Sequence, residues 1–226
     1  MNYKYIILDF GKVIALPTTG NWDITPKFLE LIDINKIDYN TFLEARKKYS
    51  DILSEKVTTL EEEYDMFLRF YDGILSEINY PNHKKKKKKI AYNRTYEFDK
   101  YTLCKNIKEE LEVLSKKYIL LLLTDNWPCV LDYLKQYDLD KYFDKIYVSS
   151  MYGVEKKDEV FFDYPIKDYN IKEGEALFID DTEINLEIAK EKGLDVLLMD
   201  REHTVVDSKY QIIHDLYLHF NEYKKQ

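Results

Sequence analysis

The sequence predicts an α/β fold built around a largely parallel sheet. Short, almost wholly apolar segments recur along the chain, and helical patterns alternate with them over its last two thirds. This alternation is typical of parallel strands joined by helices. The apolar segments lack the every-other-residue pattern of a half-exposed strand, so they are predicted to be buried on both faces. A long stretch with helical spacing follows the first strand, which indicates a helical insertion.

The first strand organises the rest of the chain. Residues 3–8 are mostly apolar and run directly into Asp9, which is followed by Phe10 and Gly11. A strand of this kind is typical of the middle of a parallel sheet, and ligands of such sheets bind beyond the carboxyl ends of the strands. Asp9 is therefore predicted at that edge, where a carboxylate acts as a nucleophile, binds a hard cation or caps a turn.

The region from residue 15 to about residue 80 is predicted to be helical, because apolar residues recur at three- and four-residue spacing. Thr59, followed three residues later by Glu62, resembles a capping box. The three predicted helices cover residues 23–31, 41–50 and 58–74. By analogy with lids that complete many sites, four side chains of this region are weaker candidates for ligand contact, against a packing or solvent-facing role: Trp22, Arg46, Lys47 and Tyr49.

A run of six lysines, Lys84–Lys89, follows His83. Adjacent like charges repel one another, so this segment is predicted to be an exposed connection and not the interior of a helix or strand. Its positive field could attract an anionic partner, although a solvated loop is the simpler interpretation. The run also marks the return of the chain from the insertion toward the sheet.

The rest of the chain alternates between helices and four further strands. The predicted strands cover residues 118–123, 145–149, 175–181 and 194–199. The predicted helices cover residues 104–117, a segment opened by Pro128, a segment from Glu159, and residues 183–192 and 208–223. Asp181 or Thr182 is expected to cap the start of the helix at residues 183–192, and Gly193 is expected to end that helix in a left-handed conformation.

Composition favours a folded, soluble protein. Of the 226 residues, 45% are hydrophobic and the formal net charge is −8, which argues against nucleic-acid or membrane binding as the main activity. Cys104 and Cys129 are too few for a disulfide framework, and no signal peptide or membrane segment is recognisable, so a cytoplasmic protein is predicted. His214 and His219 are predicted to be ordinary positions on the last helix, without zinc-type spacing to the cysteines.

Polar side chains follow four of the predicted strands. Asp9 follows the first strand, Thr124 the second and a loop with Lys156 the third, while Asp180 and Asp181 end the fourth. A parallel sheet brings these ends to one edge. Three neighbouring acids repel one another unless a cation shares them, and oxygen ligands suit Mg²⁺, which commonly works with a substrate phosphate. The sequence therefore predicts a magnesium phosphate site, in which Lys156 and Thr124 hold the remaining phosphate charge.

This ordered set resembles the haloacid dehalogenase superfamily. The segments similar to its four motifs are Asp9–Val13, Leu123–Asn126, Gly153–Asp158 and Phe178–Asp181. The resemblance spans the whole chain and implies a Rossmann-like three-layer core with an inserted α-helical cap. Residues 1–15 and 95–226 would form the core and residues 16–94 the cap, with the lysine-rich connection at 84–89.

The resemblance also implies a role for each matching residue. Asp9 would be the nucleophile that forms an aspartyl-phosphate, and its other oxygen would bind Mg²⁺. Asp181 would bind the metal directly, with Asp180 beside it as a ligand or a support, and Gly11 would offer its backbone carbonyl. Lys156 would bridge the phosphate and the nucleophile. The residues that would hold the phosphate are Thr124, Asp125, Asn126 and Lys156.

Two positions depart from the superfamily pattern. Most of its phosphatases carry an aspartate two residues after the nucleophile, where it protonates the leaving oxygen and later activates water; here that position is Gly11. General acid–base catalysis typically contributes ~10²–10⁴-fold, so slow hydrolysis of alkyl phosphates is expected unless another group supplies the proton. The Asp-x-Gly-x-Val pattern also resembles a sugar-phosphatase-like branch. Lys157 stands where proline is usual, so either lysine could bridge the phosphate, and Lys156 is favoured.

The predicted function is Mg²⁺-dependent hydrolysis of a small phosphorylated metabolite, for example a sugar phosphate, through an aspartyl-phosphate on Asp9. Two alternatives stay open: a 2-haloacid dehalogenase, which needs neither the acid nor a metal, and a noncatalytic phosphate-binding protein, which Gly11 would suit. Asp180 and Asp181 argue against the dehalogenase, since adjacent acids without a cation are costly. Specificity would lie in the cap and its loops, and the sequence sets neither the substrate nor the oligomeric state.

Overall fold

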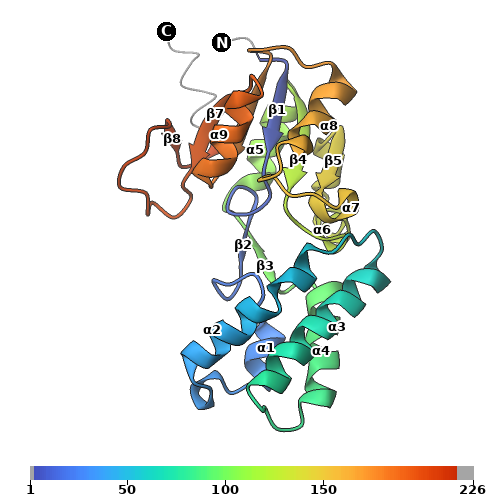
Figure 1. Cartoon of the computed structure of the whole chain (residues 1–226). Helices are drawn as coiled ribbons and strands as arrows, with labels where there is room; N and C mark the ends of the chain where they lie inside the picture. Colours follow the sequence, from blue (N-terminus) through green and yellow to red (C-terminus); the bar gives the residue numbers. More distant parts are fainter. Residues whose placement is uncertain (1–2, 218–226) are drawn as a thin grey trace.

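A six-stranded parallel sheet forms the centre of the upper part of the molecule in Figure 1. The computed structural model describes residues 3–217. The strand order is β5-β4-β1-β6-β7-β8, and every neighbouring pair is parallel. The strands are β1 (Tyr5–Leu8), β4 (Ile119–Thr124), β5 (Lys145–Val148), β6 (Ala176–Asp180), β7 (Asp195–Met199) and β8 (Ile212–Ile213). The predicted α/β fold with a parallel sheet is confirmed.

Helices cover both faces of this sheet. Ile6 and Leu8 pack with α5 (Ile107–Ser115) and α6 (Cys129–Gln136), whereas Tyr5 and Ile7 pack on the opposite face. That face is covered by α8 (Val160–Tyr169) and α9 (Glu183–Glu191), and α7 (Ser149–Tyr152) follows β5. Because successive side chains of a strand point to opposite faces, β1 must be apolar at every position. The continuous apolar run in the sequence reflects this double coverage.

A second, helical region lies below the sheet in Figure 1. Its helices are α1 (Pro26–Leu31), α2 (Tyr39–Lys48), α3 (Leu60–Glu77) and α4 (His83–Tyr96), with short 3₁₀ turns at Ile34–Lys36 and Ser50–Ser54; a third such turn, Asp140–Tyr142, belongs to the sheet region. Thr59 caps α3, and the reciprocal bond from its own N–H to the Glu62 side chain completes the predicted capping box. Phe67, Phe70 and Tyr71 on α3 belong to a separate apolar core.

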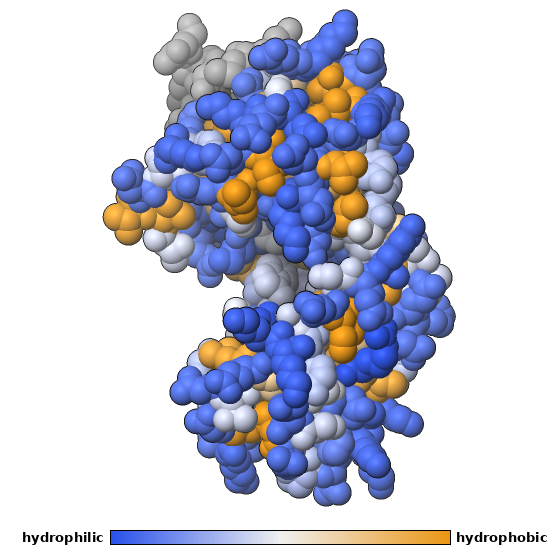
Figure 2. Space-filling model, viewed as in Figure 1, coloured by the Kyte–Doolittle hydropathy of each residue, from blue (hydrophilic) through white to orange (hydrophobic). Residues whose placement is uncertain are grey.

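Two short antiparallel strands, β2 (Ala15–Pro17) and β3 (Tyr101–Leu103), connect the two regions. The chain enters the helical region after β2 and returns through β3, so both passages lie side by side (Figure 1). Figure 2 shows an indentation between the two regions on the face in view. The sequence reading assigned residue 15 onward to helix, because three residues are too few to show a strand pattern.

The lysine run is helical, which corrects the prediction that residues 84–89 are not part of a helix, although four of the six lysines are exposed as predicted. Lys84–Lys89 form the first half of α4. Two of the lysines have partners: Lys87 pairs with Asp72 at 2.7 Å, and the Lys86 ammonium donates to the Leu31 carbonyl at 2.9 Å. Lysine also has a high helix propensity, and the buried Ile90 anchors the helix. Pairing and anchoring outweigh the repulsion between neighbouring charges.

A pair of substitutions at exposed Lys88 tests this helix. Lys88→Gly should lower the free energy of unfolding by about 1 kcal/mol relative to Lys88→Ala, because glycine loses more backbone entropy in a helix interior. Urea unfolding followed by circular dichroism measures the difference. Equal stability of the two variants would show that residue 88 is not held in a helix.

The predicted C-terminal helix is wrong over residues 208–215. There the chain bends, and Ile212 and Ile213 form β8, which pairs with Leu198 and Met199 of β7. At the free edge of β7, this apolar pair forms backbone hydrogen bonds with the sheet. This pairing is favoured over the predicted helix. His214 follows β8 and bonds the Asp200 carbonyl through Nδ1 at 2.7 Å. Residues 218–223, including His219, lie outside the described residues.

No helix in residues 3–217 is both long and apolar enough to cross a membrane.

Candidate active site

Three carboxylates meet at the carboxyl edge of the sheet. Asp9 follows the central strand β1 and donates its backbone N–H to the Ile179 carbonyl of β6 at 3.0 Å, which fixes it beside Asp180 and Asp181. One oxygen from each of these three aspartates lies within 4.8 Å of the others. Asp9 and Asp180 are buried, and the Asp181 side chain is 24% exposed. This group could hold a metal ion.

Lys156 lies within this acid cluster. Its Nζ is 2.8 Å from Asp9 Oδ1 and donates to Asp180 Oδ2 at 2.6 Å, and its side chain is only 3% exposed. The adjacent Lys157 is exposed and pairs with Glu155 at 2.7 Å. Of the two lysines that the sequence left as candidates, the fold therefore brings Lys156 to Asp9.

The two adjacent aspartates differ in their contacts. Asp180 accepts bonds from the Thr182 N–H at 2.8 Å, the Asn185 amide at 3.1 Å and the Lys156 ammonium. Asp181 accepts a bond from the Thr182 hydroxyl at 3.3 Å and has Lys12 at 3.9 Å. Asp180 is thus occupied in orienting Lys156, while Asp181 keeps more free lone pairs for a cation. Thr182 occupies the N-cap position of α9, one of the two predicted, but its side chain makes no capping bond.

Burial and mutual repulsion set the charges of the cluster. Burial raises the pKa of Asp9 to about 8, against the lowering effect of Lys156, and Asp180 and Asp181 add to the rise. Burial, followed by the charge of Asp180, also raises the pKa of Asp181. Burial alone would lower the pKa of Lys156, but Asp180 and Asp9 outweigh it, and the net shift is upward. A bound cation would stabilise the ionised carboxylates, so these residues fit a divalent metal.

The segment after β4 supplies the second group of predicted residues. Asp125 accepts the backbone N–H of Lys156 at 2.9 Å, which ties this segment to the lysine loop. The Asn126 side chain accepts bonds from the Trp127 N–H at 2.9 Å and the Tyr101 hydroxyl at 3.3 Å. Thr124 is buried at the end of its strand, as predicted.

A cavity of about 370 Å³ joins these residues to the helical region. Among the predicted residues, those that line it are Asp9, Gly11, Asp125, Asn126, Lys156 and Asp181, whereas Thr124 and Asp180 do not. Of the four weaker candidates, Trp22 and Arg46 line it. Lys47 and Tyr49 do not; the Tyr49 hydroxyl donates to Glu77 on α3.

Sequence reasoning missed two conspicuous residues of this cavity. Asp23 is buried and pairs with Arg46. Arg94, from the last turn of α4, is fully buried, with its guanidinium carbon 5.0 Å from the Trp127 ring and 5.7 Å from the Tyr101 ring. No motif spacing links these positions. The only sequence signal was their place near the two connections between sheet and helices.

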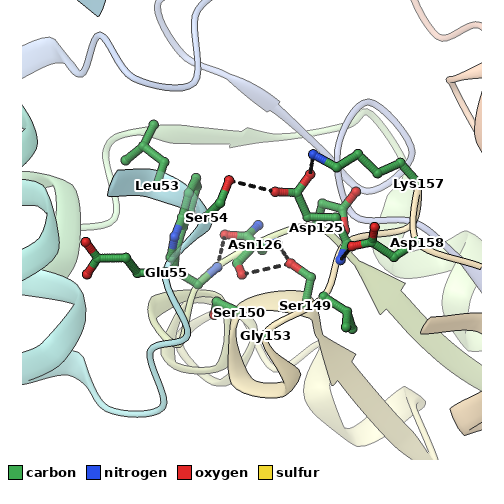
Figure 3. A pocket seen from close by; sticks show the side chains of 13 residues that line it. Leu53, Ser54, Glu55, Asp125, Asn126, Ser149, Ser150, Gly153, Lys157 and Asp158 are labelled. Carbon is green, nitrogen blue, oxygen red and sulfur yellow. Dashed lines mark hydrogen bonds and ion pairs between the residues drawn. The ribbon is translucent and has the colours of Figure 1, made fainter. Parts of the chain in front are cut away.

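A second cavity, of about 390 Å³, adjoins the first and shares Leu53, Asp125, Asn126 and Trp127 with it. Figure 3 shows Ser54 and Glu55 of the helical region on one side of this second cavity and the loops after β4 and β5 on the other. Its remaining lining residues are Ser149, Ser150, Gly153, Val154, Glu155, Lys157 and Asp158. The three clustered carboxylates line only the first cavity or lie behind it.

Residues 29–199 match the family model for haloacid dehalogenase-like hydrolases. The chain belongs to this family. The matched segment contains the loops of Asp125, Lys156 and Asp181 and begins after Asp9, whose place in the site rests on the geometry above. The resemblance stated from the motifs is confirmed, and the protein is a haloacid dehalogenase-like hydrolase.

This hydrolase resembles proteins of different activity. A segment of 89 residues is 34% identical to a D-ribitol-5-phosphate phosphatase from Bacteroides thetaiotaomicron, covering 36% of this chain and 43% of that protein. The chain thus matches less than half the length of this curated relative. Solved structures with the same fold include the hydrolase YfnB from Bacillus subtilis bound to magnesium (TM-score 0.71, 15% identity, 99% and 100% coverage) and a 2-haloacid dehalogenase from Pseudomonas syringae (0.68, 14%, 99% and 99%).

Proposed function

We propose that this hydrolase is a Mg²⁺-dependent phosphatase that acts on a small phosphorylated metabolite through Asp9. The observation that carries the proposal is the geometry of Asp9: a buried carboxylate at the end of the central strand, 2.8 Å from the Lys156 ammonium and beside two further acids, in a cavity of metabolite size. The phosphatase from Bacteroides thetaiotaomicron supports a phosphorylated sugar or polyol as substrate, and the magnesium in YfnB supports the metal.

The chemistry has two displacements. An oxygen of Asp9 forms a bond to phosphorus while the bond to the leaving oxygen breaks, and the departing alkoxide takes a proton from water because Gly11 supplies none. Water then attacks phosphorus, its proton passes to solvent, and inorganic phosphate and the Asp9 carboxylate are released. Lys156 places positive charge beside the attacking oxygen, and Thr124, Asp125 and Asn126 would position the phosphoryl group.

Asp9, Asp181 and the backbone carbonyl of Gly11 would hold the metal, with Asp180 supporting Lys156. Bound Mg²⁺ would lessen the repulsion between phosphate and carboxylate and polarise the phosphoryl oxygens. Two fully ionised anions would otherwise have to approach each other in a buried site, which is unfavourable.

Phosphate release from a panel of sugar, polyol and aryl phosphates, with Mg²⁺ or with a chelator, tests this proposal. We expect turnover only with Mg²⁺. A dehalogenase is the second candidate, favoured by the missing acid at Gly11 and the similar fold of the Pseudomonas syringae enzyme; chloride release from 2-chloropropionate without Mg²⁺ would establish it instead. Phosphate binding without turnover of the aryl ester would identify a noncatalytic phosphate-binding protein.

Restoring a side-chain acid at residue 11 should speed the first displacement. A Cβ at Gly11 would lie 3.4 Å from Asp9 Oδ2 and 3.2 Å from the Trp22 ring, and so it points into the site. Gly11→Asp should therefore raise kcat on an alkyl phosphate by about 10–10²-fold, below the full range for a native acid because the Trp22 ring must shift. An aryl phosphate, whose leaving group needs no proton, should gain much less. Gly11→Asn has the same shape without the acid; an equal gain in both variants would contradict proton donation.

A further inference from the structure

A buried arginine connects the loop after β7 to the turn that follows Asp9. Arg201 donates to the two carboxylate oxygens of Glu110 on α5, from Nη1 at 3.0 Å and from Nη2 at 2.6 Å. It also donates from Nε and Nη2 to the Val13 carbonyl, at 3.2 and 3.0 Å. The Arg201 side chain is only 7% exposed and that of Glu110 only 2%. The bidentate pair with Glu110 fixes the guanidinium plane, so its other donors are directed at one backbone oxygen.

The turn at residues 10–15 depends on this bond, because its backbone is strained. Lys12 has a φ of +53°, a left-handed conformation that a lysine rarely adopts and that its surroundings must maintain. Val13 is fully buried, and within residues 3–217 its carbonyl is bonded by Arg201 and by no backbone N–H. Loss of Arg201 would leave this oxygen without a partner away from water, which is unfavourable. The turn would therefore rearrange.

The same turn carries the group that would complete the metal site. The Gly11 carbonyl, proposed above as a metal ligand, lies two residues before Val13 in the chain. The backbone of Asp9 is anchored independently, since its N–H donates to the Ile179 carbonyl of β6 at 3.0 Å. Arg201 therefore acts on the orientation of the Gly11 carbonyl more than on that of the nucleophile. Its loss should weaken the metal site and largely spare the chemical step.

The loop that carries Arg201 is itself held at the edge of the sheet. The Asp200 N–H donates to the Ile213 carbonyl of β8 at 2.8 Å. The Asp200 side chain is buried and accepts the backbone N–H groups of Thr204 and Val205, both at 3.0 Å. These residues lie beyond residue 199, where the match to the family model ends. This part of the chain thus supports the candidate site from outside the matched segment.

We propose that Arg201 is a positioning residue that acts through the Val13 carbonyl. It holds the turn in the shape that lets the Gly11 carbonyl bind the metal. Arg201 does not line the cavity that contains Asp9, so it acts through the backbone and not on the substrate. The expected signature is a change in Mg²⁺ affinity that is separate from stability and from kcat at saturating Mg²⁺. This assignment rests on the function proposed above, from which it takes the metal site.

Calorimetric Mg²⁺ binding to full-length variants, without substrate, tests this assignment beside kcat on an aryl phosphate. Arg201→Met should raise the Kd for Mg²⁺ about tenfold, because a metal ligand loses its support, while kcat at saturating Mg²⁺ stays within about threefold. The melting temperature should also fall, because Glu110 loses its buried partner. The double variant Arg201→Met/Glu110→Met removes both charges, so its melting temperature should recover while its Kd for Mg²⁺ stays raised.

Ile74→Ala is the control for a loss of stability alone. Ile74 belongs to the apolar core of the helical region, so its truncation should lower the melting temperature and leave the Kd for Mg²⁺ unchanged. An unchanged Kd in Arg201→Met, or a Kd that recovers in the double variant together with the melting temperature, would overturn the inference and leave Arg201 a structural role only. Absence of Mg²⁺ binding by the natural protein would overturn it as well. Without turnover of the aryl phosphate, the phosphatase fails, and the Kd values still decide the role of Arg201.

Discussion

Replacing Asp9 by asparagine should abolish turnover, with a loss of about 10⁴-fold or more in kcat, because an amide oxygen does not attack phosphorus and the two-step route is lost. The fold should be retained. The asparagine side chain keeps an oxygen for the Lys156 ammonium, which also remains bonded to Asp180 at 2.6 Å. Since burial raises the pKa of Asp9, a neutral group at this position relieves desolvation. Steady-state kinetics and the melting temperature are to be measured together.

Asp125→Asn is the matched control for Asp9→Asn. Asp125 lines the same cavity, and its Oδ1 accepts the Lys156 N–H at 2.9 Å, a bond that an asparagine oxygen can also accept. We expect kcat to fall less than about tenfold. The bond from the Lys156 N–H is retained, and only one contact of the residue 125 side chain changes. An Asp9→Asn enzyme within tenfold of the natural protein would exclude Asp9 as the nucleophile.

Lys156→Met should have the second largest effect. We expect kcat to fall about 10²–10³-fold, because the charge aimed at the attacking oxygen is lost. Stability should also fall by about 3 kcal/mol, the lower end of the cost of removing one member of a buried ion pair, since Asp9 and Asp180 lose their shared cation. Added Mg²⁺ should recover part of the stability by taking over that charge.

Lys157→Met controls for the removal of a lysine from the same loop. Lys157 is exposed and pairs with Glu155, and surface pairs contribute little. We expect kcat within about threefold of the natural protein and no fall in stability that Mg²⁺ reverses. A larger kinetic loss for Lys157→Met than for Lys156→Met would reverse the assignment of the bridging cation. Chemical denaturation with and without Mg²⁺ provides the stability values.

The sheet could be predicted from the sequence because strands buried on both faces appear as continuous apolar runs. The runs that became β1, β4 and β6 are apolar up to a polar residue at or directly after the strand end, namely Asp9, Thr124 and Asp180. The helix at Lys84–Lys89 was missed because its stability comes from Asp72, Leu31 and the buried Ile90, all provided by tertiary packing. β2, β3 and β8 are two or three residues long, and such strands exist only where a partner edge is available.

The part of the candidate site that lies at the ends of strands could be predicted from the sequence. Asp9, Asp181 and Lys156 follow strands or their loops, and the parallel sheet places them together. The walls contributed by the helical region and by the loop after β5 were predicted only in part: Trp22 and Arg46 were candidates, whereas Asp23 and Arg94 were not. Ser54 and Ser150 come from segments far apart in the chain, and no spacing connects them. Whether a serine hydroxyl finds a partner depends on the final packing, which one sequence does not contain.

The pairing of β2 with β3 also constrains the order of folding. Pro17 lies opposite Tyr101, and the apolar core of the helical region is made almost wholly of residues between 24 and 91. Closing a long flexible loop is entropically costly, whereas a folded insert already holds its two ends together. We therefore expect residues 18–100 to become compact first and so to reduce the entropic cost of pairing Tyr5 with Ile119. Amide hydrogen exchange during refolding would then protect α3 before β1.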